Sequence, residues 1–261
     1  MTRIISIANE KGGVGKTTTA QHLAIGLAKK GFKVLAIDMD SQRNLSSTLG
    51  DKGQPTYRIY DTMTGQDIVN CISNTNQGIN VIYGDDRMAS ADRIFVEQEA
   101  PYILKEALEP IKNNYDYIII DTPPKSKSVA VTNAFTTSDE VIIPIQANTF
   151  SIEGLQKILD TYEKTKRYTN PNIKILGILL TMYEDRTLFR RGITKQMKEL
   201  SERIQIPLFE TTIRRGIAME EAQSQRTNIF DYDRKSNLAR DYSNFVNEVI
   251  KREKDLEGGE K

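Results

Sequence analysis

The feature that most constrains the fold of this chain is a glycine-rich loop between an apolar run and a helical pattern. The apolar run is Ile4–Ala8, the loop has the sequence KGGVGKTT at residues 11–18, and the helical pattern begins at Thr17. Backbone N–H groups can close around a polyphosphate only where side chains are absent, and three glycines meet that need. The N-terminus of the following helix adds partial positive charge. The stretch therefore predicts a phosphate-binding loop after the first strand.

Apolar runs alternate with helical patterns along the rest of the chain. Most runs are continuous, which is typical of strands covered on both faces. The alternation predicts an α/β fold with a doubly wound, mostly parallel sheet and helices on both faces. The predicted strands are Ile4–Ala8, Lys33–Ile37, Ile79–Tyr83, Tyr117–Ile120, Val141–Ile145, Ile175–Leu180 and Ile206–Phe209. The predicted helices are roughly 17–30, 88–113, 127–137, 152–168, 188–203 and 235–254.

Length and composition narrow the classes of protein. The 261 residues fit one P-loop domain over 1–256, followed by a tail at 257–261 that we expect to be disordered. The polar stretch 51–78 is expected to be a surface excursion. A single cysteine, Cys71, excludes a disulfide framework and a cysteine-based metal site. No apolar run reaches the roughly 18 residues of a membrane span, so a cytoplasmic protein is expected.

Carboxylates stand at the ends of two predicted strands. The second strand ends in Ile37-Asp38-Met39-Asp40, and the fourth ends in three isoleucines followed by Asp121. A buried strand accommodates such acids where they face a charged ligand, and Mg²⁺ with an attacking water would be one. Asp121 has the position of a Walker B acid, which accepts hydrogen bonds from Mg²⁺-bound water. For Asp38 and Asp40 the alternative is a pair of solvated acids at a strand end.

The loop itself departs from the usual P-loop pattern. Lys16 is predicted to reach the β- and γ-phosphates, and the Thr17 hydroxyl to ligate Mg²⁺. Glu10 stands where the usual pattern has a glycine, and a second lysine, Lys11, stands at the loop entrance. The predicted phosphate-binding residues are Lys11, Gly12, Gly13, Val14, Gly15, Lys16, Thr17 and Thr18.

This two-lysine loop resembles the deviant Walker A loop of the ParA/MinD family of P-loop ATPases. The resemblance runs from Arg3 to about Ile250 and includes the Asp38-x-Asp40 and Asp121-Thr-Pro-Pro motifs, although Ser41 replaces a usual proline. It implies an ATPase that uses ATP and Mg²⁺. It also implies that Asp40 positions or activates the attacking water and that Asp38 lies near Mg²⁺, acting through water.

Two further roles follow from the resemblance alone. Lys11 would reach across the interface of an ATP-dependent homodimer to the partner's bound nucleotide, acting with Lys16 and Asp40 in catalysis, as an arginine finger does. The loops after the sixth and seventh predicted strands would hold the adenine, which implies contacts from Met182 and Ile213. A core role suits Met182 equally well.

A basic region lies in the C-terminal part of the chain. Between Arg186 and Arg215 there are eight basic and three acidic residues, a local net charge of +5 in a chain of net charge +1. Such a region can neutralise phosphates without reading sequence, and a solvated helix face is the alternative. ParA-like proteins bind non-specific DNA through this region. The predicted DNA-binding residues are Arg186, Arg191, Lys195, Lys198, Arg214 and Arg215.

The leading hypothesis is a nucleoid-associated plasmid or chromosome partitioning ATPase. Its ATP-bound dimer would bind DNA, and a ParB-like centromere-binding partner would stimulate hydrolysis and release. The alternative is a MinD-like membrane-cycling ATPase, but the end of the last helical pattern, at 251–257, has mixed charge and few apolar residues. Iron–sulfur chemistry would need more than one cysteine. A small-molecule ligase on a related P-loop fold generally lacks an equivalent of Lys11.

Overall fold

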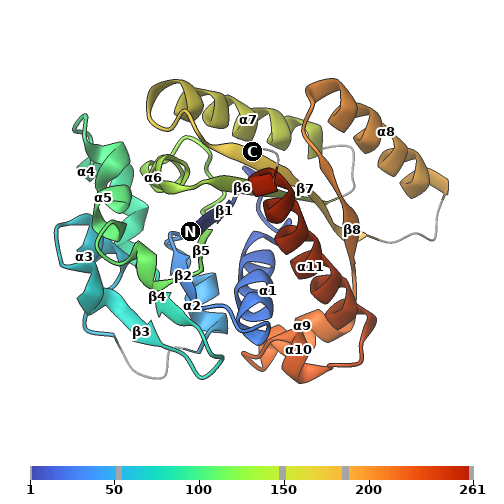
Figure 1. The fold of residues 1–261 in the computed structure, drawn as a ribbon, viewed down its shortest axis with the longest axis horizontal. Helices are drawn as coiled ribbons and strands as arrows, with labels where there is room; N and C mark the ends of the chain where they lie inside the picture. Colours follow the sequence, from blue (N-terminus) through green and yellow to red (C-terminus); the bar gives the residue numbers. More distant parts are fainter. Residues whose placement is uncertain (1, 51–54, 147–150, 184–187, 259–261) are drawn as a thin grey trace.

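The computed structural model describes residues 2–50, 55–146, 151–183 and 188–258 (Figure 1). Within these ranges eight strands form one sheet in the order β3-β4-β2-β5-β1-β6-β7-β8, and every neighbouring pair except β3 and β4 is parallel. The predicted doubly wound, mostly parallel sheet is therefore confirmed. The strands are β1 (Arg3–Ile7), β2 (Val34–Asp38), β3 (Ile72–Asn74), β4 (Asn80–Ile82), β5 (Tyr117–Asp121), β6 (Glu140–Gln146), β7 (Lys174–Tyr183) and β8 (Leu208–Arg214).

Helices cover both faces of the sheet. Side chains of α1, α2, α10 and α11 pack on one face, and side chains of α3, α5, α6, α7 and α8 pack on the other. The helices are α1 (Lys16–Lys29), α2 (Asn44–Thr48), α3 (Ile59–Met63), α4 (Ala91–Ile94), α5 (Ile103–Leu108), α6 (Val129–Thr137), α7 (Ser151–Tyr168), α8 (Leu188–Ile204), α9 (Ile217–Ser224), α10 (Ile229–Tyr232) and α11 (Asn237–Gly258).

The order of the strands places β1 in the interior of the sheet, between β5 and β6. β1 pairs with β5 on one side and β6 on the other, so the chain builds outward in both directions from it. Ligands of open α/β sheets bind at the carboxyl ends of the strands, at such a switch point. The sequence at 11–18 follows β1 directly and lies at this point.

Two parts of the fold differ from the sequence-based expectations. The short antiparallel strand β3 lies inside the stretch 51–78, where no strand was expected, because a three-residue edge strand has too few residues for a pattern. The predicted helix over 88–113 is wrong as a single element. It is divided into α4, α5 and 3₁₀ segments, with Pro101 in one of these segments and Pro110 after α5.

The C-terminal helix is longer than its sequence pattern indicated. α11 continues to Gly258, so the first two residues of the expected tail are helical, and 259–261 lie outside the described residues. In its apolar stripe, Phe245, Val246 and Val249 are fully buried in the core. Among the described residues, no helix combines the length and apolar character needed to cross a membrane.

Candidate nucleotide-binding site

The phosphate loop, residues 11–18, joins β1 to α1. Gly15 precedes the first residue of α1 with a φ of 85°, a left-handed conformation that is strained for residues with a Cβ. Neighbouring elements hold the loop in place. The Thr181 hydroxyl at the end of β7 donates to the Val14 carbonyl at 2.7 Å, and the Lys11 N–H donates to the Asn9 carboxamide oxygen at 3.0 Å. The loop is thus ordered by the protein itself.

Lys16 is buried at the base of the loop. Its Nζ donates to the Lys11 carbonyl at 3.0 Å, which folds the side chain back over the loop. Burial lowers the pKa of Lys16, and the nearby Asp121 carboxylate opposes that effect. An ammonium group has three donors, so further donors can face phosphate oxygens that enter the loop.

Thr17 and Asp121 form the candidate Mg²⁺ site. The Thr17 hydroxyl donates to Asp121 Oδ2 at 2.7 Å, and the buried Asp121 Oδ1 has no hydrogen-bond partner among the described residues. Burial, together with repulsion from Asp38, raises the pKa of Asp121 well above its usual value. A divalent cation with its waters would satisfy both the charge and the orphaned oxygen, so these residues fit Mg²⁺.

The rest of the candidate metal site agrees with the preferences of magnesium. Mg²⁺ keeps several waters and binds one or two protein oxygens together with substrate phosphates. In the part of the chain that the structure describes, no group of three or more His, Cys, Asp or Glu side chains is arranged to hold a metal alone. A nucleotide would therefore have to supply the remaining ligands.

Asp38 pairs in register with Asp121 on the neighbouring strand. Its Oδ2 accepts from the Ser46 N–H at 2.8 Å and from the Ser46 hydroxyl at 2.6 Å, and its Oδ1 accepts from the Asp40 N–H at 3.1 Å. Burial raises the pKa of Asp38 to about 6. Asp38 thus fastens α2 and the Asp40 backbone to the end of β2.

Asp40 follows β2 and, together with the phosphate loop, lines the cavity that is described below. Its carboxylate accepts from the Gln42 N–H at 3.0 Å, and the residue is 6% exposed. That position can present a carboxylate to a water close to the phosphates. The sequence-based role of Asp40 in positioning the attacking water remains a prediction.

Gly84 and Ser46 support this site but were missed at the sequence level. The Gly84 N–H donates to the Ser46 hydroxyl at 2.7 Å, and a Cβ on Gly84 would lie 2.8 Å from Asp38 Cγ. A residue with a side chain would displace the Asp38 carboxylate. The available signal was a glycine directly after the apolar run that ends at Tyr83, at the carboxyl edge where ligands bind.

A cavity of about 680 Å³ opens from the phosphate loop. This volume lies within the range of small-molecule sites. Met182 and Ile213, the predicted adenine contacts, both line it, and α9 closes another side, where Gln223 donates to the Thr18 hydroxyl at 2.9 Å. Predicted site residues that line the cavity are Gly12, Gly13, Gly15, Lys16, Thr17, Thr18, Asp40, Met182, Ile213, Arg214 and Arg215.

Lys11 is placed differently from Lys16. Its backbone carbonyl contacts Lys16, but Lys11 is not among the described residues that line the cavity of its own chain. The loop therefore separates its two lysines, because Lys16 lines the cavity and Lys11 does not.

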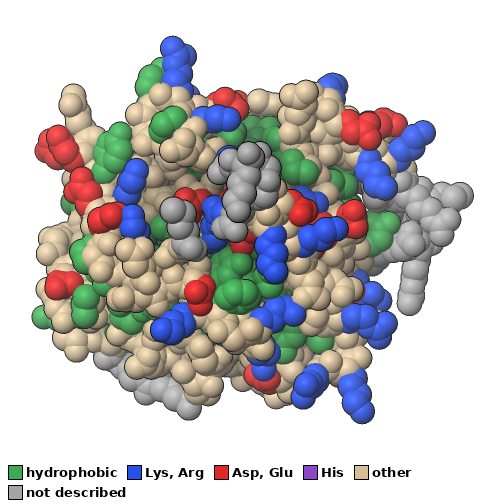
Figure 2. All heavy atoms as spheres, viewed as in Figure 1, with side chains coloured by type: hydrophobic (Ala, Val, Ile, Leu, Met, Phe, Trp, Pro, Cys, Tyr) green, Lys and Arg blue, Asp and Glu red, His purple; other side chains and the backbone are tan. Residues whose placement is uncertain are grey.

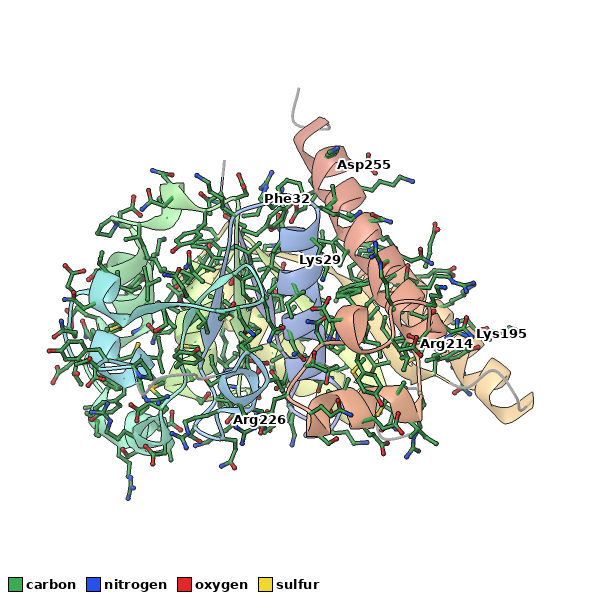
Figure 3. The ribbon with its side chains drawn as sticks, turned by 90° about the horizontal axis from the view of Figure 1, so that it is seen from below. Lys29, Phe32, Lys195, Arg214, Arg226 and Asp255 are labelled. Carbon is green, nitrogen blue, oxygen red and sulfur yellow. The ribbon has the colours of Figure 1, made fainter. Side chains whose placement is uncertain are left out.

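The predicted DNA-binding residues do not form one uniform surface. Arg214 makes a two-pronged ion pair with Asp241 of α11, with Nε and Nη2 at 2.6 and 2.8 Å from its oxygens. Lys195 and Lys198 are exposed on α8, and Lys195 lies 3.9 Å from Glu199 (Figure 3). Arg215 is exposed at the cavity mouth. Arg186 lies outside the described residues, and Arg191 is part of α8.

Comparison with known proteins agrees with this geometry. A family model described as an AAA domain matches residues 2–175. The sporulation initiation inhibitor protein Soj of Bacillus subtilis is 38% identical over 253 residues, covering 95% of this chain and 98% of Soj. The chromosome partitioning protein ParA of Caulobacter vibrioides is 36% identical over 261 residues, covering 97% and 96%. The chain belongs to the ParA/Soj family of P-loop ATPases.

Solved structures related to this ParA/Soj-family chain include nucleotide complexes. A cobyrinic acid a,c-diamide synthase from Mycobacterium smegmatis, with bound ADP and magnesium, superposes with a TM-score of 0.84 at 28% identity, covering 97% of this chain and 96% of that one. A putative plasmid partition protein from Borrelia burgdorferi bound to AMPPNP gives 0.79 at 27% identity, covering 97% and 98%. The P-loop fold and its nucleotide site are thus shared across proteins with different named roles.

Proposed function

We propose that this ParA/Soj-family ATPase is a plasmid or chromosome partitioning protein. It acts as one P-loop domain over 1–256 that binds ATP with Mg²⁺, and its ATP-bound homodimer binds DNA without sequence preference. Hydrolysis, stimulated by a ParB-like centromere-binding partner, releases it from DNA. The protein would then cycle on the nucleoid in the cytoplasm. The proposal depends on one observation, that Lys16 lines the nucleotide cavity whereas Lys11 of the same loop does not. The names of the relatives, which include a chromosome partitioning protein and a putative plasmid partition protein, support it.

In this mechanism each residue has a distinct task. The loop N–H groups and Lys16 bind the β- and γ-phosphates, while Thr17 and Asp121 hold Mg²⁺, with Asp38 acting through water. When bound, Mg²⁺ neutralises charge on the phosphates. Asp40 orients the attacking water. Positioning and charge stabilisation of this kind account for most of the catalysis of phosphoryl transfer.

Lys11 gives the reason for dimerisation. A cation that lies outside its own cavity can complete the cavity of a second copy, where it stabilises the charge that develops on the phosphates. Hydrolysis then depends on assembly, and we expect it to be slow without the partner protein. Met182 and Ile213 would contact the adenine from the loops after β7 and β8.

The membrane-cycling alternative is disfavoured by the packing of α11. The apolar stripe of this helix is buried in the core and is not available to a bilayer. The DNA-binding proposal therefore takes precedence, with Arg191, Lys195, Lys198, Arg215 and Arg214 as contacts, the last only if its pair with Asp241 opens.

The test is the binding of a labelled random-sequence duplex, followed by fluorescence anisotropy without nucleotide, with ADP and with ATP. Asp40→Ala is used to keep the ATP state populated. Binding that requires ATP and weakens with salt is expected. Equal binding in all nucleotide states, or none in any, would contradict the DNA part, and phosphate release by the unmodified chain checks the ATPase part separately.

A further inference from the structure

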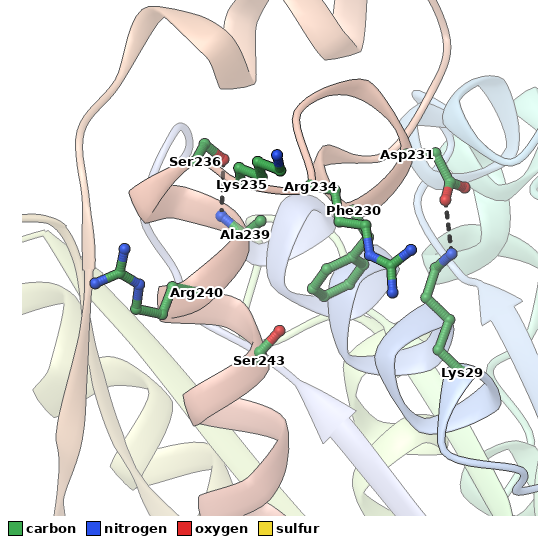
Figure 4. Close-up of a pocket in the computed structure, with 9 residues that line it drawn as sticks. All are labelled: Lys29, Phe230, Asp231, Arg234, Lys235, Ser236, Ala239, Arg240 and Ser243. Carbon is green, nitrogen blue, oxygen red and sulfur yellow. Dashed lines mark hydrogen bonds and ion pairs between the residues drawn. The ribbon is translucent and has the colours of Figure 1, made fainter.

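A second cavity, of about 690 Å³, lies between the end of α1 and the start of α11 (Figure 4). Its walls come from two segments that are far apart in the sequence, the end of α1 at Lys29 and the stretch from Phe230 to Ser243. We call it the basic groove and define it by Lys29, Phe230, Asp231, Arg234, Lys235 and Arg240. It contains none of the DNA-binding residues that were predicted from the sequence.

The charge of the basic groove is strongly one-sided. Four cations line it against one acid, and the Asp231 carboxylate is already engaged by Lys29 Nζ at 2.6 Å and by the Asn228 amide at 2.8 Å. Within the described residues, Arg234, Lys235 and Arg240 form no ion pair with an acid. In Figure 2, Lys and Arg side chains gather at the lower right, over the region of α10 and the start of α11.

The exposure of these cations indicates what kind of anion fits. Lys29, Arg234, Lys235 and Arg240 are all exposed, so a ligand would lie across the groove and would not be enclosed by it. A small phosphate ligand is normally held by buried donors, whereas a nucleic-acid backbone presents a row of phosphates to surface Lys, Arg and Ser side chains. Ser243 also lines the groove and adds such a donor, whereas the Ser236 hydroxyl already donates to the Asp233 carbonyl at 2.7 Å.

The groove shares a wall with the nucleotide cavity. In the first two turns of α11, Leu238 and Tyr242 line the nucleotide cavity, while Ala239, Arg240 and Ser243 line the basic groove. A movement of this helical segment in response to nucleotide would therefore change both sites.

A buried aromatic stack makes a second connection. The His22 ring stacks on Tyr242 with centroids 4.4 Å apart and lies 5.6 Å from Phe230, which lines the basic groove. His22 Nδ1 donates to the carbonyl of Thr18 in the phosphate loop at 2.7 Å, and Nε2 accepts from the Ile229 N–H at 3.0 Å. The phosphate loop and α10 are thus joined through one side chain.

We propose that the basic groove binds the phosphate backbone of duplex DNA and that the first turns of α11 and the His22 stack link its occupancy to the bound nucleotide. This inference rests on the proposed function, because it names where a nucleotide-dependent DNA contact is made. It assigns that contact to α1, α10 and α11 in addition to the α8 face.

The first experiment compares the wild-type chain with the double variant Arg234→Ala/Arg240→Ala in the anisotropy assay. Loss of two phosphate contacts is expected to weaken binding about tenfold and to lower the slope of log affinity against log salt by about two. Binding of a fluorescent ATP analogue should remain within about twofold. The matched control is Lys164→Ala/Lys166→Ala, which removes two exposed cations from α7 on the opposite face of the sheet.

The outcomes separate this inference from the proposed function. If the wild-type chain binds no duplex in any nucleotide state, the DNA part of the proposed function fails. If it binds and the groove variant keeps its affinity and salt slope, the groove is not the contact. Competition by inorganic triphosphate at equal phosphate concentration should be weak. Competition as strong as that of duplex DNA would overturn the assignment to a nucleic-acid backbone.

The link between the sites is tested by hydrogen exchange of the unmodified chain with ADP and with a non-hydrolysable ATP analogue. Segment 229–243 is expected to exchange differently in the two states, whereas α5 should not change. Phe230→Leu, which shortens the stack, should reduce the ratio of DNA affinities in ATP and ADP, and Phe230→Tyr should restore it. Identical exchange in both states would refute the coupling even if Phe230→Leu did not fold.

Discussion

Buried carboxylates lie at both ends of the parallel strands, which we call the carboxyl edge and the amino edge, but only those at the carboxyl edge adjoin the nucleotide cavity. At the carboxyl edge, Asp121 keeps an oxygen without a partner among the described residues and lies next to the phosphate loop. At the amino edge, Glu140 begins β6 with 2% exposure, and Arg3 Nη1 lies 3.6 Å from its Oε1, while its buried Oε2 also has no hydrogen-bond partner among the described residues. Nearby, the Tyr117 hydroxyl donates to Glu253 of α11 at 2.6 Å.

The difference lies in what surrounds each acid. Burial, reinforced by Glu253, raises the pKa of Glu140 to about 8, and Glu140 and Glu253 line neither the nucleotide cavity nor the basic groove. Protein groups close the amino-edge cluster, while the carboxyl-edge cluster faces a cavity that a ligand can enter. A shifted pKa by itself therefore does not identify a site, because access to a ligand is also required.

Lys16→Ala should produce the largest effect, a loss of ATP hydrolysis, and it tests whether the carboxyl edge is the functional one. Loss of the buried ammonium removes charge stabilisation of the phosphates, so phosphate release should fall by about 10²–10³-fold. Lys164→Ala, an exposed lysine on α7, is the control and should leave the rate unchanged. Retention of more than a tenth of the wild-type rate by Lys16→Ala would show that the loop is not the catalytic site.

Glu140→Gln tests how the raised pKa of this buried acid at the amino edge affects the stability of the fold. As pH rises above about 4.5 the unfolded chain loses this proton first, while the folded chain keeps it until about pH 8. Stability should therefore fall with rising pH across this window, with a slope from this group of at most about 1.4 kcal/mol per pH unit. Urea unfolding at several pH values should show a flatter dependence for Glu140→Gln, whereas the exposed Glu163→Gln should follow the wild type.

Gly84→Ala tests how tightly the carboxyl edge is packed. The added methyl group would meet Asp38 at 2.8 Å, so the free energy of unfolding should fall by about 1–2 kcal/mol and ATP turnover should fall with it. Ser46→Ala removes the hydroxyl that bridges Gly84 and Asp38 and should reproduce part of the loss in turnover. A fully active Gly84→Ala chain would mean that the position of Asp38 is not critical.

Asp121→Asn should change the free energy of unfolding the least, and it should raise that free energy where Gly84→Ala lowers it. Without nucleotide or Mg²⁺, removing the buried charge next to Asp38 should raise the free energy of unfolding by about 1 kcal/mol. With ATP and Mg²⁺, the variant should lose most of the thermal stabilisation that the wild type gains. A variant that is still stabilised by ATP and Mg²⁺ to the wild-type extent would exclude Asp121 from the metal site.

The sequence was most informative where chemistry or burial leaves a local pattern. Strands buried on both faces produce continuous apolar runs, and the predicted strands that overlap β1, β2, β4, β5, β6 and β7 are confirmed. The seventh, Ile206–Phe209, overlaps only the first two residues of β8 (Leu208–Arg214), because β8 lies at the end of the sheet and is only partly buried. The phosphate loop and the strand-end acids were recognisable because glycine, lysine and aspartate have few other uses there. Asp38 and Asp121 were found separately, but their pairing in register depends on the strand order.

Features made by distant segments could not be predicted in the same way. Arg214 was selected for its charge, but its partner Asp241 lies 27 residues later on another element. The basic groove combines Lys29 with residues about 200 positions further on, as its bond to Asp231 shows. The helix expected over 88–113 looked continuous because its periodic apolar residues outweighed Pro101 and Pro110 in the pattern.

The packing of α1 against α11 has a consequence for the synthesis of the protein. The phosphate loop and α1 leave the ribosome well before α11, but His22, Leu23 and Ile25 are covered in the finished fold together with Tyr242 and Phe245. Until the last helix emerges, the nascent chain must expose this apolar surface. A message truncated before α11 would therefore yield a chain that carries the nucleotide motif but is a substrate for chaperones and proteases.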